Sequence, residues 1–84
     1  MLKIERTKAF EKDFKKVGLI SPLVDVLHYL INEEKLPVKY RDHTLKGNYA
    51  LFRECHVKPD LLLLYYIEDD ILKLVRLANH SDLF

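Results

Sequence analysis

The chain has 84 residues, and this length restricts it to a single domain over residues 1–84. Hydrophobic residues make up 49% of the sequence and charged residues 32%, a balance that excludes a disordered or fibrous protein. Lysines and arginines number 14 against 13 aspartates and glutamates, so the formal charge of +1 gives no overall reason to expect a polyanionic partner. A nucleic-acid partner has to be argued from local charge.

The sequence carries no feature typical of export or of a membrane. Its only cysteine, Cys55, cannot form an internal disulfide. The longest apolar run covers residues 61–67, whereas a membrane-spanning helix needs about 20 apolar residues. The opening stretch MLKIERTKAF lacks the apolar core of a signal peptide. We therefore expect a cytoplasmic protein with no membrane partner.

The first half of the chain predicts one short strand and two helices. The strand is expected over residues 2–5, after which Thr7 is a suitable N-cap and Gly18 a suitable C-cap for the first helix. Ser21 followed by Pro22 is typical of the N-cap and first turn of a second helix, which continues towards residue 32. The gap between the helices is so short that we expect an antiparallel αα-hairpin. The apolar stripes of the two helices are Phe10, Phe14 and Val17, then Leu23, Leu27, Leu30 and Ile31.

The second half predicts a polar connector followed by strands. The connector covers residues 38–48, and three strands are expected over residues 49–57, 61–67 and 71–77. Turns are expected at residues 58–59 and 68–70. The three strands form an antiparallel meander, and with the N-terminal strand they make a sheet of about four strands covered by the helical hairpin. The predicted fold class is α+β.

Charge is unevenly distributed along this second half. Residues 35–58 hold six bases and two acids, a local balance of +4, whereas residues 59–72 hold four acids and no base. The basic stretch is the candidate surface for a phosphate backbone, although scattered surface bases also serve solubility alone. The candidate RNA-binding residues in this stretch are Lys39, Arg41, Lys46, Arg53 and Lys58.

Three of the four histidines also lie in the second half: His43, His56 and His80. His56 and Asp60 flank a predicted turn and are candidate partners on adjacent strands. We expect the three imidazoles, Asp60 and the guanidinium groups of Arg53 and Arg76 to share one concavity. Histidine can both accept and donate a proton near neutral pH, and RNA cleavage needs both transfers. One group deprotonates a ribose 2′-OH, another protonates the departing 5′-oxygen, and a cation stabilises the phosphorane-like transition state.

Two other uses of these residues are possible. A zinc site could draw on the three histidines, Asp60 and Cys55, but the sequence has no HExxH or CxxC spacing, so we expect no metal and no cofactor. Cys55 and His56 are adjacent in a predicted strand and point to opposite faces, which disfavours a Cys-His nucleophilic pair. We expect Cys55 to be buried. The terminal Phe84 is a candidate for stacking on a base.

Three motifs of this half, taken together, resemble a known family. They are DH-x-L-x-G at residues 42–47, RECH-x-x-PD at residues 53–60 and HS-x-LF at residues 80–84. The chain resembles YafQ-type toxins of the RelE/ParE superfamily over its whole length, and the order of elements also fits a RelE-like fold. The resemblance implies an endoribonuclease of a type II toxin–antitoxin system that cleaves messenger RNA at the ribosome and is held inactive by a cognate antitoxin.

The resemblance also implies roles for individual residues. It implies a catalytic set of His43, His56, Asp60, His80, Arg76 and Phe84. In this scheme His80 is the general acid, His43 or the pair of His56 and Asp60 serves the 2′-OH, Arg76 stabilises the phosphate and Phe84 orients a base. The alternative within the superfamily is a ParE-like inhibitor of a topoisomerase, which needs no acid–base set. A further alternative is an inactive domain that only binds its antitoxin.

Overall fold

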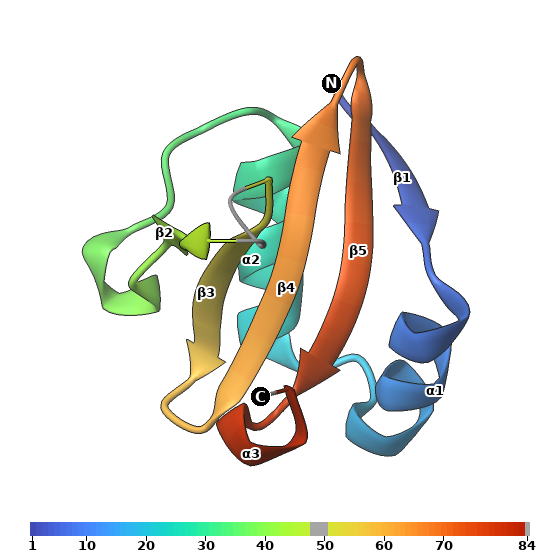
Figure 1. The fold of residues 1–84 in the computed structure, drawn as a ribbon. Helices are drawn as coiled ribbons and strands as arrows, with labels where there is room; N and C mark the ends of the chain where they lie inside the picture. Colours follow the sequence, from blue (N-terminus) through green and yellow to red (C-terminus); the bar gives the residue numbers. More distant parts are fainter. Residues whose placement is uncertain (48–50, 84) are drawn as a thin grey trace.

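Helices dominate the first half of the chain and strands the second half in the computed structural model, which describes residues 1–47 and 51–83 (Figure 1). The class is α+β, as predicted. The elements are β1 (Lys3–Arg6), α1 (Lys8–Val17), α2 (Ser21–Ile31), the 3₁₀ turn η1 (Val38–Tyr40), β2 (His43–Thr44), β3 (Arg53–Lys58), β4 (Leu61–Glu68), β5 (Ile71–Ala78) and α3 (His80–Leu83). In the described part no helix is long and apolar enough to cross a membrane.

The sheet has five strands in the order β1-β5-β4-β3-β2, rather than the four predicted. The extra strand is β2, which pairs with β3 over two residues and lies in the segment predicted to be a plain connector. The strand predicted from residue 49 begins later, at Arg53, although residues 49 and 50 lie outside the described residues. The N-terminal strand β1 joins the opposite edge, parallel to β5. The β3–β4–β5 meander is confirmed.

Beyond the end of β1, side chains at the start of α1 and within it bind the exposed backbone edge of β5. The Thr7 hydroxyl accepts a hydrogen bond from the Phe10 N–H at 3.0 Å, as expected of an N-cap, and donates one to the Val75 carbonyl at 2.6 Å. Six residues after Thr7, Asp13 accepts from the backbone N–H of Leu77 at 2.9 Å. Backbone groups of β5 that would otherwise form an open sheet edge are thereby satisfied by side chains of the preceding segment.

The connection between the helices is as short as predicted, but the N-cap residue of the second helix differs from the prediction. Gly18 adopts φ +80°, a region that glycine enters without strain, and its N–H bonds to the Phe14 carbonyl at 2.7 Å. The N-cap of α2 is Ile20 and not Ser21, which is the first helical residue and makes no capping hydrogen bond. Pro22 occupies the first turn and favours the helix start in place of a side-chain cap.

One residue of β5 has no counterpart on β4. Tyr65 is opposite Leu74 and Leu64 is opposite Arg76, so Val75 is an extra residue in a β-bulge. On the near side of the bulge Leu74 faces the core, and on the far side Leu77 does. The bulge therefore inverts the alternation of the strand and turns Arg76 and Ala78 to the other face.

The two faces of the sheet have different roles. Helix α2 lies behind β3 and β4 in Figure 1, and the core lies between helices and sheet, with Leu23 and Val26 of α2 packed among Cys55, Leu63 and Leu77. Each large aliphatic side chain buried there contributes about 1.5–3 kcal/mol. The opposite face, which we call the site face, carries Glu54 and His56 of β3, Leu62 and Leu64 of β4, and Arg76 and Ala78 of β5.

Candidate active site

Strand register arranges the site face in two rows. The first row runs from His43 through Glu54 and Leu64 to Arg76, and the second from His56 through Leu62 to Ala78. Adjacent strands are about 4.8 Å apart, so His56 and Ala78 are separated by about 10 Å. His80 follows Ala78 by two residues, at the start of α3. The register therefore places His43 and His56 on the site face, and His80 lies two residues beyond the end of the second row.

Glu54 is the residue at the centre of this face that sequence reasoning missed. Its carboxylate is buried, with 6% of the residue exposed, and Oε1 lies 3.4 Å from His43 Nε2. Its other oxygen, Oε2, is buried and has no hydrogen-bond partner within the described part of the chain. A carboxylate held out of water with one oxygen unpaired is costly to maintain, and such groups concentrate at functional sites. The available signal was its alternation with Cys55, which places Glu54 and His56 on one face.

The two ring nitrogens of His43 both face acceptors. Nδ1 lies 2.7 Å from the carbonyl oxygen of Arg41, and a carbonyl can only accept, so Nδ1 carries a proton. Nε2 lies 3.4 Å from Glu54 Oε1. The imidazole of His43 is thus held between two oxygen atoms of the protein.

His56 lies beside His43 but has a different hydrogen-bond partner. Its ring centroid lies 6.3 Å from that of His43, with the ring planes tilted by 35°. Its Nδ1 lies 3.4 Å from the Pro59 carbonyl, again an acceptor, so the proton of a neutral ring belongs on Nδ1. Nε2 is then the basic nitrogen. Of the two facing histidines, His56 is the one suited to accept a proton.

Asp60 does not pair with His56 across the strands as predicted. The register places Leu62 opposite His56, and Asp60 lies in the turn between β3 and β4. Its exposed side chain lines a separate hollow of about 620 Å³, together with Arg76, Asn79 and Asp13. The hairpin register therefore gives His56 and Asp60 different surroundings.

Arg76 is held by Asp13 of α1. The guanidinium donates from Nε at 2.7 Å and from a terminal nitrogen at 3.1 Å, a two-point contact. Burial opposes ionisation of Asp13, but hydrogen bonds from Arg76 and the Leu77 N–H outweigh it and hold the pKa of Asp13 below its usual value. Arg76 is thereby fixed in direction and stays a cation at the rim of the site.

His80 is exposed at the first position of the short helix α3, which the sequence did not predict. The preceding Asn79 caps this helix, because its side-chain oxygen accepts from the Asp82 N–H at 2.8 Å and from the Ser81 hydroxyl at 3.0 Å. The cap sets where the chain turns back after β5. Phe84, the predicted base-stacking residue, lies outside the described residues.

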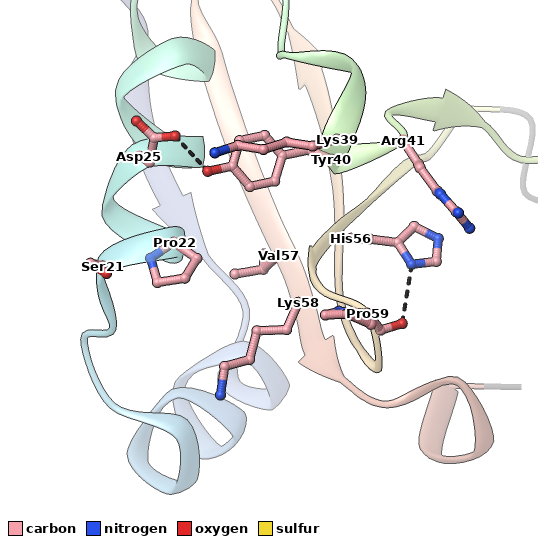
Figure 2. Close-up of a pocket in the computed structure, with 10 residues that line it drawn as sticks. All are labelled: Ser21, Pro22, Asp25, Lys39, Tyr40, Arg41, His56, Val57, Lys58 and Pro59. Carbon is pink, nitrogen blue, oxygen red and sulfur yellow. Dashed lines mark hydrogen bonds between the residues drawn. The ribbon is translucent and has the colours of Figure 1, made fainter.

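A groove of about 670 Å³ begins at His56 and passes around the edge of β3 (Figure 2). Its cations come from η1 and its flank, in Lys39 and Arg41, and from the end of β3, in Lys58. Arg41 and His56 point to the same side in Figure 2, whereas Asp25 lies at the other wall. There Tyr40 donates a hydrogen bond of 2.5 Å to Asp25, which with burial raises the pKa of Tyr40 to about 12. Three of the five predicted RNA-binding residues thus line one groove.

The other two predicted RNA-binding residues lie elsewhere. Arg53 points to the helix-covered face, where a terminal guanidinium nitrogen contacts Asp42 at 2.6 Å. This pairing, despite partial burial, raises the pKa of Arg53 above its usual value. Lys46 is exposed in the segment after β2. The prediction of one shared concavity is therefore wrong for Arg53, and Asp60 and Arg76 line a hollow other than the groove at His56.

The next two features are the surroundings of Cys55 and the grouping of side chains that could bind a metal. Cys55 is fully buried in the core, as expected, and burial raises the pKa of its thiol to about 12, which makes it a poor nucleophile. Among the described residues, no group of three or more His, Cys, Asp or Glu side chains is placed to hold a metal ion.

Fold and site together define a small α+β protein with acid–base side chains on one sheet face and cations around them. The family described as "Bacterial toxin of type II toxin-antitoxin system, YafQ" matches residues 2–84, and the chain belongs to this family. The "mRNA interferase toxin YafQ" of Escherichia coli K12 is 34% identical over 86 residues, covering 96% of this chain and 94% of the relative.

Solved structures agree with this assignment. A metal-bound toxin from Helicobacter pylori is 50% identical with a TM-score of 0.90, and both chains are covered completely. The E. coli DinJ–YafQ complex contains a chain that is 32% identical with a TM-score of 0.86, covering 100% of this chain and 99% of that one. The RelE-like architecture expected from the sequence is thus the architecture of YafQ structures.

Proposed function

We propose that this type II toxin is an endoribonuclease that cleaves mRNA by proton transfer between its own side chains and the RNA. The observation that carries the proposal is the pair of facing histidines, His43 and His56, with the buried Glu54 beside one of them. The name of the E. coli relative, mRNA interferase toxin YafQ, supports the choice of substrate. The complex of that protein family with DinJ supports a cognate antitoxin as partner.

The reaction uses the two histidines that differ in their surroundings. His56 Nε2 accepts the proton of a ribose 2′-OH, and the 2′-oxygen attacks the adjacent phosphorus. The bond from phosphorus to the 5′-oxygen breaks as His80 donates a proton to that oxygen. The products are a 2′,3′-cyclic phosphate and a free 5′-OH, so every proton taken from the RNA side is matched by one returned.

Two cations stabilise the charge that develops on the phosphate. His43, held between the Arg41 carbonyl and Glu54, faces His56 across the site and serves as a positive charge in place of a base. Arg76, oriented by Asp13, supplies the second. This assignment differs from the sequence-based scheme, in which His43 or the pair of His56 and Asp60 acted on the 2′-OH.

The groove beside His56 carries the RNA backbone away from the site. Lys39, Arg41 and Lys58 line it, and a phosphate backbone is attracted to such a row irrespective of sequence. Exposed Lys46 can extend this track, whereas Arg53 is already bound to Asp42 and is left out of it. We place the action of the toxin in the cytoplasm, on mRNA at the ribosome, with Phe84 beside the base at the cleavage position.

The test is cleavage of a short single-stranded RNA by the purified toxin and, in parallel, of mRNA on ribosomes. His56→Ala and His80→Ala should each lower the rate by about 10²–10⁴-fold without changing thermal stability. His28→Ala is the matched control, since His28 is exposed on α2 and should have no effect. The product ends should be a cyclic phosphate and a 5′-OH. Growth arrest by the wild type with no RNA cleavage in either assay would contradict the proposal and favour a non-catalytic inhibitor.

Dependence on metal is tested in the same assay. Because the proposed steps use only groups of the chain and the RNA, cleavage should persist in excess EDTA at its original rate. Complete loss of cleavage in EDTA, restored by a divalent cation, would contradict the proposed mechanism. The control is the folded state of the protein in EDTA, followed by circular dichroism.

A further inference from the structure

A side-chain hydrogen bond joins helix α2 to the turn η1, and the proposed mechanism does not use it. The Tyr40 hydroxyl donates to Asp25 Oδ2 at 2.5 Å, between residues 15 positions apart in the chain. The Tyr40 ring is buried in the core, so its hydroxyl lies at the end of a firmly packed side chain. A hydrogen bond to a carboxylate is charge-assisted and belongs to the stronger kinds. Tyr40 therefore attaches η1 to α2 at one defined point (Figure 2).

This attachment is independent of pH in the range where histidines titrate. The bond to Asp25, together with burial, raises the pKa of Tyr40 to about 12. An unperturbed histidine titrates near a pH of about 6.5. The Tyr40 hydroxyl therefore keeps its proton, and remains a donor to Asp25, while the histidines of the site change charge.

The residue after Tyr40 has a backbone conformation that needs support. Arg41 adopts φ +49° and ψ +44°, a left-handed region that residues other than glycine keep only where the surrounding structure holds them. Its N–H closes η1 by donating to the Val38 carbonyl at 2.9 Å. Its own carbonyl accepts from His43 Nδ1 at 2.7 Å. The turn that Tyr40 attaches to α2 therefore sets the direction of the carbonyl that binds His43.

His43 depends on this carbonyl because its own strand is short. Strand β2 pairs with β3 over two residues, and 47% of the His43 side chain is exposed, so packing alone does not fix the ring. Glu54 Oε1 lies 3.4 Å from Nε2, beyond the usual hydrogen-bond distance, whereas the Arg41 carbonyl lies 2.7 Å from Nδ1. The shorter contact is the one that orients the imidazole.

We propose that Asp25 and Tyr40 are positioning residues for RNA cleavage, and that their hydrogen bond orients His43 through η1 and the Arg41 carbonyl. The inference rests on the proposed function, in which His43 faces His56 across the site. Neither positioning residue touches the reacting atoms in this role. Without the bond, Arg41 can leave its left-handed conformation, and His43 then loses the acceptor for its Nδ1 proton. A displacement of about 1 Å at a catalytic group is enough to slow a reaction severely.

Tyr40→Phe tests the proposal, because it deletes the hydroxyl and keeps the buried ring. Tyr29→Phe is the matched control, since it makes the same change one turn along α2 from Asp25 and leaves the bond in place. In cleavage of the RNA that the wild type cuts, Tyr40→Phe should lower kcat about tenfold and change KM less than about threefold, because phosphate contacts tolerate small shifts. The control should keep both values.

Variants of the acceptor give an independent measurement. Asp25→Ala leaves the Tyr40 ring intact and should lower kcat as Tyr40→Phe does. Asp25→Asn keeps an oxygen that can accept from the hydroxyl, and should recover most of the rate that Asp25→Ala loses. Thermal melts of all four variants give the folded fraction, and each rate is expressed per folded molecule.

The imidazole of His43 supplies a readout that needs no cleavage. Nitrogen NMR at about pH 8, above the ordinary histidine pKa, reports which ring nitrogen carries the proton. A His43→Gln protein assigns the signals. The wild type and Tyr29→Phe should carry the proton on Nδ1, and Tyr40→Phe should shift it towards Nε2.

A Tyr40→Phe protein with the wild-type kcat, or with an unchanged His43 spectrum, would overturn the proposal. So would a loss of rate that disappears when it is expressed per folded molecule, since the bond would then be structural only. Failure of the wild type to cleave RNA, free or on ribosomes, would contradict the proposed function alone, because the NMR comparison still tests the link from Tyr40 to His43.

Discussion

Two polar clusters lie back to back on opposite faces of the sheet and are built from neighbouring residues. Asp42 and Arg53 form one cluster with Tyr65 on the helix-covered face, and His43 and Glu54 form the other on the site face. In the first, both oxygens of Asp42 are bound, by the guanidinium and by the tyrosine hydroxyl. In the second, one oxygen of Glu54 is buried without a partner in the described structure.

This difference indicates what each cluster does. A fully bonded buried network stabilises one backbone arrangement, whereas an incompletely bonded carboxylate costs stability and keeps an unused acceptor at the site. The Asp42 cluster fixes β2 against β3 and β4, and the Glu54 cluster then has His43 and His56 in defined positions. Variants of the first should therefore alter stability, and variants of the second should alter catalysis.

Among variants of these two clusters, the largest effect is expected from Glu54→Gln. The amide cannot favour a charged His43 as a carboxylate does, so RNA cleavage should fall by about 10²-fold, or about 2.7 kcal/mol of transition-state stabilisation. Single-turnover cleavage of a short RNA measures it. Glu34→Gln, at an exposed position, is the control. If the Glu54→Gln variant cleaved RNA at the wild-type rate, the Glu54 cluster would have no role in catalysis.

Asp42→Asn should act mainly on stability. It takes the charge from the partner of Arg53 and Tyr65, and should lower the free energy of unfolding by about 1–3 kcal/mol. Urea denaturation measures this loss, and cleavage per folded molecule should stay near that of the wild type. A variant that is as stable as the wild type but inactive would show that the two clusters cannot be separated by role.

A third carboxylate, Asp13, is fully bonded like Asp42, and its contribution should depend on pH. Its pKa is lowered in the folded protein, so its stabilisation is present above the ordinary carboxyl pKa of about 4 and is lost as pH falls through the folded value. Thermal melts between neutral pH and about pH 3 follow this loss. Asp13→Asn should be less stable at neutral pH and show a shallower acid dependence. An identical acid dependence in both proteins would contradict the assignment.

The smallest effect is expected from Tyr65→Phe. The change deletes one hydroxyl that donates to Asp42 and leaves the buried ring in place, at a cost of about 1 kcal/mol. Tyr66→Phe on the site face is the matched control and should change stability by less than about 0.5 kcal/mol. Equal effects in urea denaturation would mean that the network adds nothing beyond ring burial.

Periodicity and capping residues predicted most of the fold. Thr7, Gly18 and the continuous apolar run of residues 61–67 act locally, so the start of α1, its end and the buried strand β4 followed from the sequence. Strand β2 did not, because two residues carry no period and pair only once β3 is in place. Ser21 failed as an N-cap because proline in the first turn made a side-chain cap unnecessary.

The side chains of the candidate site could be proposed from the sequence by their type, but their arrangement could not. The motifs led to His43, His56 and His80 because reactive side chains can be recognised by type. Glu54 could not be distinguished from a surface acid until its burial was known, and Arg53 could not be assigned to a face until the register of β3 was known. The roles proposed for the two facing histidines depend on the carbonyl groups of Arg41 and Pro59, which no side-chain pattern reports.

The extra residue at Val75 has a consequence for how this strand can change. Before the bulge, even-numbered residues such as Leu72 and Leu74 point to the core. After it, the odd-numbered Leu77 points to the core, and Arg76 and Ala78 point to the site face. Straightening the strand with all its residues kept would exchange the places of Arg76 and Leu77, putting a guanidinium in the core and an aliphatic chain on the site face. Deleting residue 75 would instead bring Leu74 and Arg76 into regular alternation and keep both faces as they are, so this strand should accept a deletion there better than a straightened bulge.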